Sequence, residues 1–217
     1  MVTGAALADR PTRWPAREVA RLDGRVASFV TEQVAAPGGE TLTRDWLRHP
    51  GAVTVIALDD HDRIAVVAQY RHPAGLTLIE PPAGLLDCAG ESAWAAARRE
   101  LAEEAELEAA DWRVLVDVCT SPGISQESIR VFLARDLRPA TRPAGFVLEG
   151  EEAVMSVGWA DLAETVEAVL AGRLQSPTLV AGALALWAAR ADGGAGLAGL
   201  RPPDAPWLAR QARAAHD

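Results

Sequence analysis

Two apolar runs dominate the middle of the chain, one from Ala52 to Leu58 and one from Ile64 to Tyr70, with the polar segment Asp59-Asp60-His61-Asp62 between them. Both runs are rich in β-branched residues, which strands favour, and a short polar turn between two such runs is typical of an antiparallel hairpin. We therefore predict a hairpin over residues 52–70, and any fold for this chain has to accommodate it.

Strands and helices alternate after this hairpin. The Pro/Gly-rich link from Glu80 to Gly84 leads to a predicted helix from about Ser92 to Leu107, and Ser92 is suited to be its N-cap. The remaining pattern predicts strands over 112–119, 129–134 and 154–159, and helices over 162–171 and 178–191. Hairpins among strands that interleave with helices indicate an α/β fold in which helices cover a mixed sheet.

The two ends of the chain differ from this middle part. Before residue 50, predicted strands over 26–30 and 41–47 flank Pro37-Gly38-Gly39 and form an N-terminal β-hairpin appendage. Such a hairpin cannot bury its apolar face alone, so we expect it to pack on the main domain or on a second subunit. We divide the chain into residues 1–49, a β-rich segment for dimerisation, residues 50–192, the main domain, and residues 193–217, a C-terminal tail rich in Gly, Pro and Ala whose order the sequence does not determine.

Charge and composition exclude several classes of partner. The formal net charge of -9 argues against binding to nucleic acid or to an anionic membrane, because both are polyanions. We expect no secretory signal, and the apolar stretch 179–200 is interrupted by Arg190 and Asp192, so a cytoplasmic protein is predicted. Cys88 and Cys119 are too few and too far apart for a zinc site.

Three acids share one side of the predicted helix. At 100° per residue, Glu100, Glu103 and Glu104 lie on one arc, beside an apolar side that includes Leu101. Like charges three or four residues apart destabilise a helix by about 0.2–0.5 kcal/mol per pair. The arc is therefore either fully solvated or the holder of a cation, and the three acids alone leave both alternatives open.

The residues around the acids form a recognisable pattern. Gly84, Glu91 and the run Arg99-Glu100-Leu101-x-Glu103-Glu104 resemble the Nudix box, Gly-x5-Glu-x7-Arg-Glu-apolar-x-Glu-Glu-x-Gly-apolar. The resemblance implies an α/β/α sandwich whose loop-helix-loop binds divalent metal on a nucleoside diphosphate. The chain departs from the box twice, with six residues between Gly84 and Glu91 and with Glu106 where the box has Gly. Because Gly commonly ends a helix with positive φ, Glu106 should destabilise the helix end by about 1 kcal/mol.

The resemblance also assigns roles. Glu100 and Glu104 would bind the metal together with the backbone carbonyl of Ala83, Glu103 would take part in catalysis, and Arg99 would pair with Glu91 to brace the loop. Mg²⁺, with Mn²⁺ as the alternative, suits such a site because it prefers oxygen ligands and accepts substrate phosphates among them. The metal would orient the diphosphate and generate hydroxide from water.

Residues outside the box resemble the ADP-ribose pyrophosphatase branch of the family. The matching segments are Gln69-Tyr70-Arg71, Glu80-x-Pro82-Ala83-Gly84 and Ser121-Pro122-Gly123 with a following Glu127. Pro122 lies 16 positions after Glu106, and a proline at this distance marks the branch.

The branch implies further site residues. Arg71 would hold phosphate oxygens, and Arg44 resembles an arginine that the N-terminal hairpin lends to the substrate, often across a dimer. Glu80 would contact the nucleoside or would only satisfy backbone amides. Glu152 is our predicted general base, with Glu151 as its alternative. Trp46 either stacks on adenine or only packs, and packing is the commoner role.

The resemblance predicts a homodimeric enzyme that hydrolyses ADP-ribose to AMP and ribose 5-phosphate. One alternative is a Nudix hydrolase of another compound, such as an ADP-sugar, a dinucleotide or a damaged nucleoside triphosphate. The other is a non-catalytic domain that binds a nucleotide and regulates a partner. The intact set of Glu100, Glu103 and Glu104 disfavours a pure binding module, which has no need of it.

Overall fold

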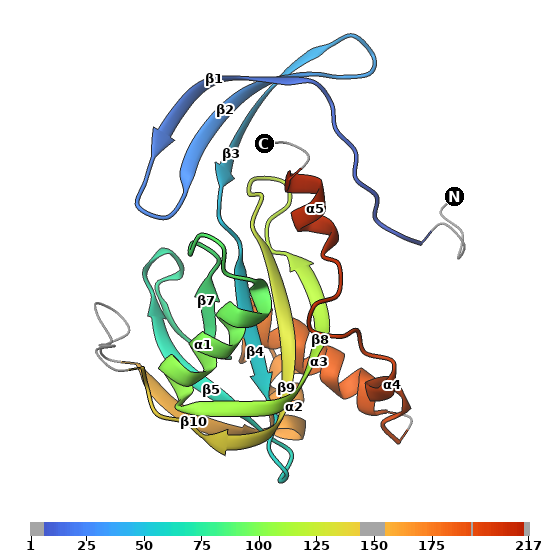
Figure 1. Cartoon of the computed structure of the whole chain (residues 1–217). Coiled ribbons are helices and arrows are strands. Elements are labelled where there is room, and N and C mark those ends of the chain that lie inside the picture. Colours follow the sequence, from blue (N-terminus) through green and yellow to red (C-terminus); the bar gives the residue numbers. More distant parts are fainter. Residues whose placement is uncertain (1–6, 144–154, 192, 215–217) are drawn as a thin grey trace.

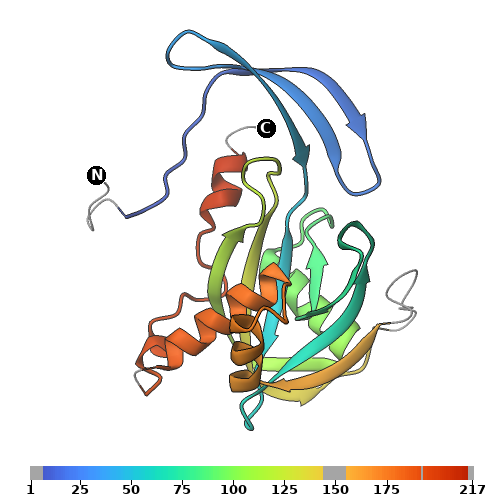
Figure 2. The ribbon, with the colours of Figure 1, turned by 180° about the vertical axis from the view of Figure 1, so that it is seen from behind.

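A computed structural model of the chain describes residues 7–143, 155–191 and 193–214 (Figure 1). An N-terminal sheet stands apart from a larger α/β body, and β3 leads directly from one into the other. The C-terminal helix α5 lies beside this junction in both views (Figures 1 and 2). Within the described ranges, no helix is long and apolar enough to cross a membrane.

The N-terminal sheet has three antiparallel strands. Its order is β1 (Ala16–Asp23), β2 (Ser28–Ala35), β3 (Thr41–Arg48). The predicted hairpin corresponds to β2 and β3, but β1 was not predicted. Every residue of β1 is exposed and half of them are charged, so it lacks the apolar alternation by which a strand is recognised from sequence.

Two sheets form the larger body. The first has the order β7 (Ala83–Leu85), β4 (Ala52–Ala57), β9 (Ser128–Pro139), β8 (Leu107–Cys119), and it is mixed because β4 and β9 are parallel. The second has the order β10 (Ser156–Asp161), β5 (Arg63–Arg71), β6 (Leu76–Glu80). A 3-10 turn, η2 (His72–Ala74), connects β5 to β6.

Helices cover both faces of the first sheet. Alternate residues of β4 point to opposite sides, so Val53 and Val55 share a core cluster with Leu101 of α1 (Ala93–Ala105). Ile56 belongs to a second cluster with Leu179 of α3 (Pro177–Arg190), to which α2 (Leu162–Leu170) also contributes. The predicted α/β/α sandwich with a mixed sheet is thereby confirmed.

The predicted hairpin over residues 52–70 exists only at its turn. The Asp59 carboxylate accepts hydrogen bonds from the amides of His61 and Arg63, and Leu58 pairs with Ile64. Beyond this point β4 and β5 separate into different sheets, so the prediction of continuous pairing was wrong. Every residue of β4 is buried, because it lies between two layers of helices and not on the half-solvated face of a hairpin.

The described part of the C-terminal segment packs against the body, a point that the sequence left open. It contains α4 (Ala195–Ala198) and α5 (Leu208–Ala214). The amide of Val114 donates to the carbonyl of Arg201 at 2.9 Å, and the Trp207 side chain is buried. Its Gly- and Ala-rich composition concealed these few but specific contacts.

Candidate active site

Helix α1 begins and ends as a capped helix should. The Ser92 hydroxyl accepts a hydrogen bond from the amide of Ala95 at 3.1 Å, which confirms the predicted N-cap. At the other end Glu106 adopts a left-handed conformation with φ of 54°, and its amide donates to the carbonyl of Leu101. The helix therefore ends where the Nudix pattern requires, although no glycine is present.

The acidic arc of α1 is buried. Glu100, Glu103 and Glu104 are 9%, 8% and 5% exposed. The alternative of a fully solvated acidic face is therefore wrong. Burying three carboxylates on one helix is unfavourable unless positive charge or hydrogen-bond donors accompany them.

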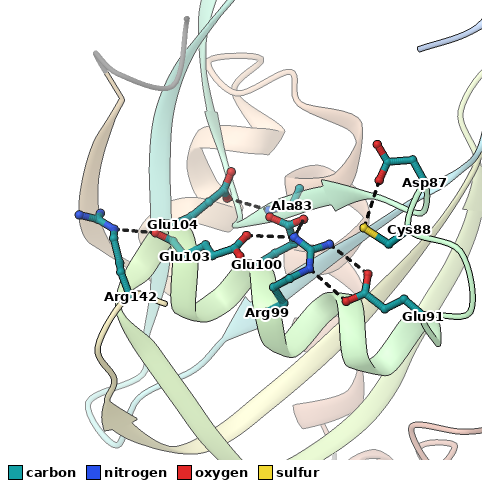
Figure 3. Close-up of polar contacts among 9 residues, drawn as sticks. All are labelled: Ala83, Asp87, Cys88, Glu91, Arg99, Glu100, Glu103, Glu104 and Arg142. Carbon is teal, nitrogen blue, oxygen red and sulfur yellow. Dashed lines mark hydrogen bonds and ion pairs between the residues drawn. The ribbon is translucent and has the colours of Figure 1, made fainter. Parts of the chain in front are cut away.

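Arg99 supplies part of that positive charge (Figure 3). Its guanidinium donates to both carboxylate oxygens of Glu91, at 3.0 and 3.1 Å, which is the predicted brace between loop and helix. Its Nη1 atom also donates to Glu100 at 2.6 Å and to Glu103 at 2.9 Å. The hydrogen bonds to Glu91, with smaller contributions from Glu100 and Glu103, raise the pKa of Arg99 above its ordinary value, so it stays charged.

Strand β7 closes the site on the other side. The amide of Ala83 donates to Oε2 of Glu104 at 2.9 Å. A Cβ atom on Gly84 would lie 1.9 Å from Oε1 of Glu100, so only glycine lets this carboxylate rest on the strand. The preceding Pro82 is fixed, because its carbonyl accepts hydrogen bonds from the Val55 amide at 2.8 Å and from the Thr54 hydroxyl at 3.0 Å.

The donor set fits a hard divalent cation in type and charge. Glu91, Glu100 and Glu103 contact the guanidinium of Arg99, and Glu104 lies one residue further along α1, so the four carboxylates carry more negative charge than this one guanidinium balances. Glu100 and Glu103 are turned toward Arg99, and in the described part of the chain no three acidic, histidine or cysteine side chains converge on a common point. A metal would thus draw these carboxylates away from Arg99.

Arg142 was not predicted and belongs to this region (Figure 3). Its Nε atom donates to the carbonyl of Glu103 at 2.7 Å, and its Nη1 atom pairs with the carboxylate of Glu106 at 2.9 Å. The side chain thus caps the last turn of α1 and contacts the residue that replaces the glycine of the box. Arg142 reaches this helix end only through the fold of the chain, so its spacing in the sequence did not indicate the contact.

Arg71 and Glu80 lie together, as an ion pair between β5 and β6. Nε and Nη2 of Arg71 donate to Oε2 of Glu80 at 2.9 and 2.6 Å. The Glu80 side chain is 9% exposed, whereas the Arg71 side chain is 41% exposed. The carboxylate of this pair is therefore buried and its guanidinium is accessible to solvent. Neither of the two roles considered for Glu80, contact with the nucleoside or hydrogen bonding to backbone amides, included this ion pair.

Arg44 and Trp46 do not lie at the acidic cluster of α1. They line a cavity of about 730 Å³ between the N-terminal sheet and the loop before β9. Pro122, Gly123 and Arg213 also line it, whereas none of its described lining comes from α1. The indole of Trp46 donates to Glu32 at 3.1 Å, and the guanidinium carbon of Arg48 lies 5.3 Å from its ring centre. These contacts hold the Trp46 side chain in the lining of this cavity.

The remaining acids named from the sequence are Glu127, Glu151 and Glu152. Glu151 and Glu152 lie outside the described residues. Glu127 is held in the loop before β9, where its carboxylate accepts a hydrogen bond from the Thr120 hydroxyl and lies 3.7 Å from Nδ1 of His49, while its own amide donates to the Ser125 hydroxyl at 3.0 Å. This acid therefore shapes the loop that carries Pro122.

Comparison with known proteins defines the class of this chain. The family model for the NUDIX domain matches residues 48–178, so the chain belongs to the NUDIX family. It is 44% identical over 187 residues to an ADP-ribose pyrophosphatase of Mycobacterium tuberculosis, covering 86% of this chain and 87% of the relative. An ADP-ribose pyrophosphatase of Bacillus subtilis is 40% identical over 114 residues, covering 52% and 61%.

Two further similarities broaden this picture. A methanol dehydrogenase activator of Bacillus methanolicus is 39% identical over 122 residues, covering 56% of this chain and 65% of the relative. Among solved structures, one of an ADP compounds hydrolase matches with a TM-score of 0.65 at 21% identity, covering 86% of this chain and 97% of that chain. At this identity the structural match supports the fold alone.

Proposed function

We propose that this chain is a divalent-metal-dependent hydrolase that cleaves the diphosphate of ADP-ribose with one water molecule, giving AMP and ribose 5-phosphate. The buried cluster of Glu100, Glu103 and Glu104 supports the diphosphate chemistry, because Arg99 balances only part of its negative charge and a divalent cation would balance more. The relative of M. tuberculosis, similar over most of both chains, supports ADP-ribose as the substrate.

The residues divide the work as follows. Glu100, Glu104 and the carbonyl of Ala83 would hold Mg²⁺ or Mn²⁺, and Glu103 would complete the acidic set. A bound metal supplies charge neutralisation and an activated water. Arg99 holds Glu91 and so keeps the loop from Gly84 to Glu91 against α1.

Two residues would act on the substrate and one on the water. Glu80 fixes Arg71 so that its exposed guanidinium is presented to a phosphate oxygen pair. Arg44 would reach the nucleoside end from the N-terminal sheet. Glu152 would accept the proton of the attacking water, with Glu151 as the alternative.

Substrate choice is tested by AMP release at equal enzyme concentration and saturating Mg²⁺. ADP-ribose is expected to give a higher kcat/KM than ADP-sugars, dinucleotides or nucleoside triphosphates. A better result with any of those compounds would replace ADP-ribose as the substrate and keep the hydrolase. If the chain bound a nucleotide but hydrolysed none of these compounds, a non-catalytic regulator would be favoured. The similarity to the methanol dehydrogenase activator of B. methanolicus supports testing this alternative.

The N-terminal segment, residues 1–49, is proposed to form a homodimer. Leu22, Phe29 and Leu47 are direct neighbours across the three strands and therefore share one face. These three side chains are 72%, 43% and 39% exposed. Exposure of such a row of apolar side chains to water is unfavourable, so a partner surface is expected to cover it. Light scattering after size exclusion at micromolar concentration should give twice the mass of the chain, and a monomer would contradict the dimer.

The cellular compartment is proposed to be the cytoplasm. Cys88 and Cys119 are both exposed free thiols. Free thiols persist most readily in a reducing compartment.

A further inference from the structure

The C-terminal segment is anchored by one buried arginine. Arg130 of β9 is 2% exposed, and it donates to the carbonyls of Ala205 at 2.6 Å and Pro206 at 3.0 Å. It also forms two hydrogen bonds with Asp117 of β8, and its guanidinium carbon lies 4.8 Å from the ring centre of Trp207. The position at which α5 begins is therefore fixed to the central sheet.

Arg213, near the end of α5, connects two segments that are far apart in sequence. Its Nη1 atom donates to the carbonyls of His49 and Pro50, both at 2.8 Å, and its Nη2 atom donates to the carbonyl of Gln126 at 2.6 Å. The first two carbonyls belong to the link between β3 and β4, and the third belongs to the loop before β9. The planar guanidinium suits three acceptors in this arrangement, whereas a lysine ammonium would not hold the same fork.

These same segments are joined by backbone hydrogen bonds. The amide of Leu47 donates to Ile124 at 2.8 Å, and the amide of Gln126 donates to Leu47 at 3.0 Å. The N-terminal sheet is thus attached to the loop that carries Pro122. Arg213 fastens this attachment and, with Arg44, Trp46 and Pro122, is part of the lining of the cavity.

We propose that Arg213 is a positioning residue for substrate binding: it clamps the link at 49–50 to the loop at 121–127, so that the cavity between sheet and loop is formed before a substrate arrives. The inference rests on the proposed function, because it assigns that cavity to the nucleoside end of the substrate. If the cavity lining became ordered only when substrate binds, the entropy lost in ordering it would weaken substrate binding. The clamp therefore acts on KM and leaves the acids of α1 undisturbed.

The test compares Arg213→Gln and Arg213→Lys with Arg173→Gln as a matched control. Arg173 is an exposed arginine whose described ion pair with Glu167 is long, at 3.9 Å, and remote from the clamp. Arg213→Gln is expected to raise KM for ADP-ribose about tenfold while kcat stays within about twofold, since only ground-state positioning is lost. Arg213→Lys should recover part of this loss, and the control should match the wild type.

A second measurement separates the clamp from general stability and from the choice of substrate. Hydrogen exchange without substrate should become faster in peptides covering 45–50 and 121–127 of Arg213→Gln, and should stay unchanged elsewhere. Unchanged KM together with unchanged exchange in these peptides would overturn the proposal, as would faster exchange throughout the chain, which indicates plain destabilisation. If the wild type hydrolysed another compound and not ADP-ribose, the proposed substrate would fail, and the KM comparison would be made with that compound.

Discussion

Glu104 accepts a hydrogen bond from the backbone of β7, and this contact lets its structural and chemical roles be separated. In Glu104→Gln the amide oxygen can still accept from Ala83, so the fold should be nearly intact. The lost negative charge should weaken metal binding and lower kcat at least about a hundredfold. Steady-state kinetics and thermal denaturation measure the two effects, with the exposed Glu108→Gln as control. Turnover equal to that of the wild type would remove the metal role from Glu104.

Gly84 offers a second test at the level of one atom. In Gly84→Ala the new Cβ would overlap Glu100, and because the overlapping group is the end of a flexible side chain, the carboxylate should move while the fold remains. The Mg²⁺ concentration for half-maximal activity should rise about tenfold, which corresponds to one weakened ligand of about 1.4 kcal/mol. Gly158→Ala on β10, where a Cβ meets nothing within 4 Å, is the matched control. Equal Mg²⁺ dependence in both variants would exclude Glu100 as a ligand.

At the scale of elements, the C-terminal end of α1 combines an unfavourable conformation with a compensating pair. Glu106→Gly should stabilise the fold by about 1 kcal/mol, because glycine adopts the left-handed conformation without strain. The same substitution removes the exposed ion pair with Arg142, which should cost about 0–1 kcal/mol of stability. In an Arg142→Ala background only the relief remains, so the same substitution should stabilise more there. Urea unfolding of the four proteins gives the double-mutant cycle. Equal effects in both backgrounds would mean that the pair contributes nothing.

The link between β3 and β4 should respond to pH. Burial lowers the pKa of His49 and Arg213 lowers it further, while Glu127, 3.7 Å away, opposes both. His49 also accepts a hydrogen bond from the Gly51 amide through Nδ1, which its protonation there would break. Because the folded pKa lies below the ordinary value of about 6.5, the unfolded chain binds more protons in this range, and stability is lost as pH falls through it.

Urea unfolding between pH 7.5 and pH 5 tests this expectation. Asparagine at 49 can accept from the Gly51 amide through its side chain without titrating, as it does in Asx turns. The free energy of unfolding should therefore decline less with falling pH in His49→Asn than in the wild type. Parallel declines would show that His49 does not contribute to the pH dependence.

Over the whole molecule, what the sequence predicted was local. The N-cap Ser92, the acids of α1 and the predicted helices near 162–171 and 178–191 depend on neighbours within a few turns, and each was found within one or two residues. The partners of β4 and β5 depend on which surfaces meet in three dimensions, so their pairing was predicted wrongly. Arg142 and Arg213 act on backbone carbonyls from distant segments, and no spacing in the sequence marks such contacts.

The assembly of two copies is the prediction that concerns the whole molecule. Phe29 lies in the middle of the exposed apolar row, between Leu22 and Leu47, so a polar residue there should weaken association most. Phe29→Ser is expected to raise the dimer dissociation constant at least about tenfold, because burying a phenylalanine contributes about 1.5–3 kcal/mol. Gln33→Ser, on the same strand and face but outside the row, is the control, and analytical ultracentrifugation over a dilution series measures both. If Phe29→Ser dimerised as tightly as Gln33→Ser, another surface would have to hold the two copies together.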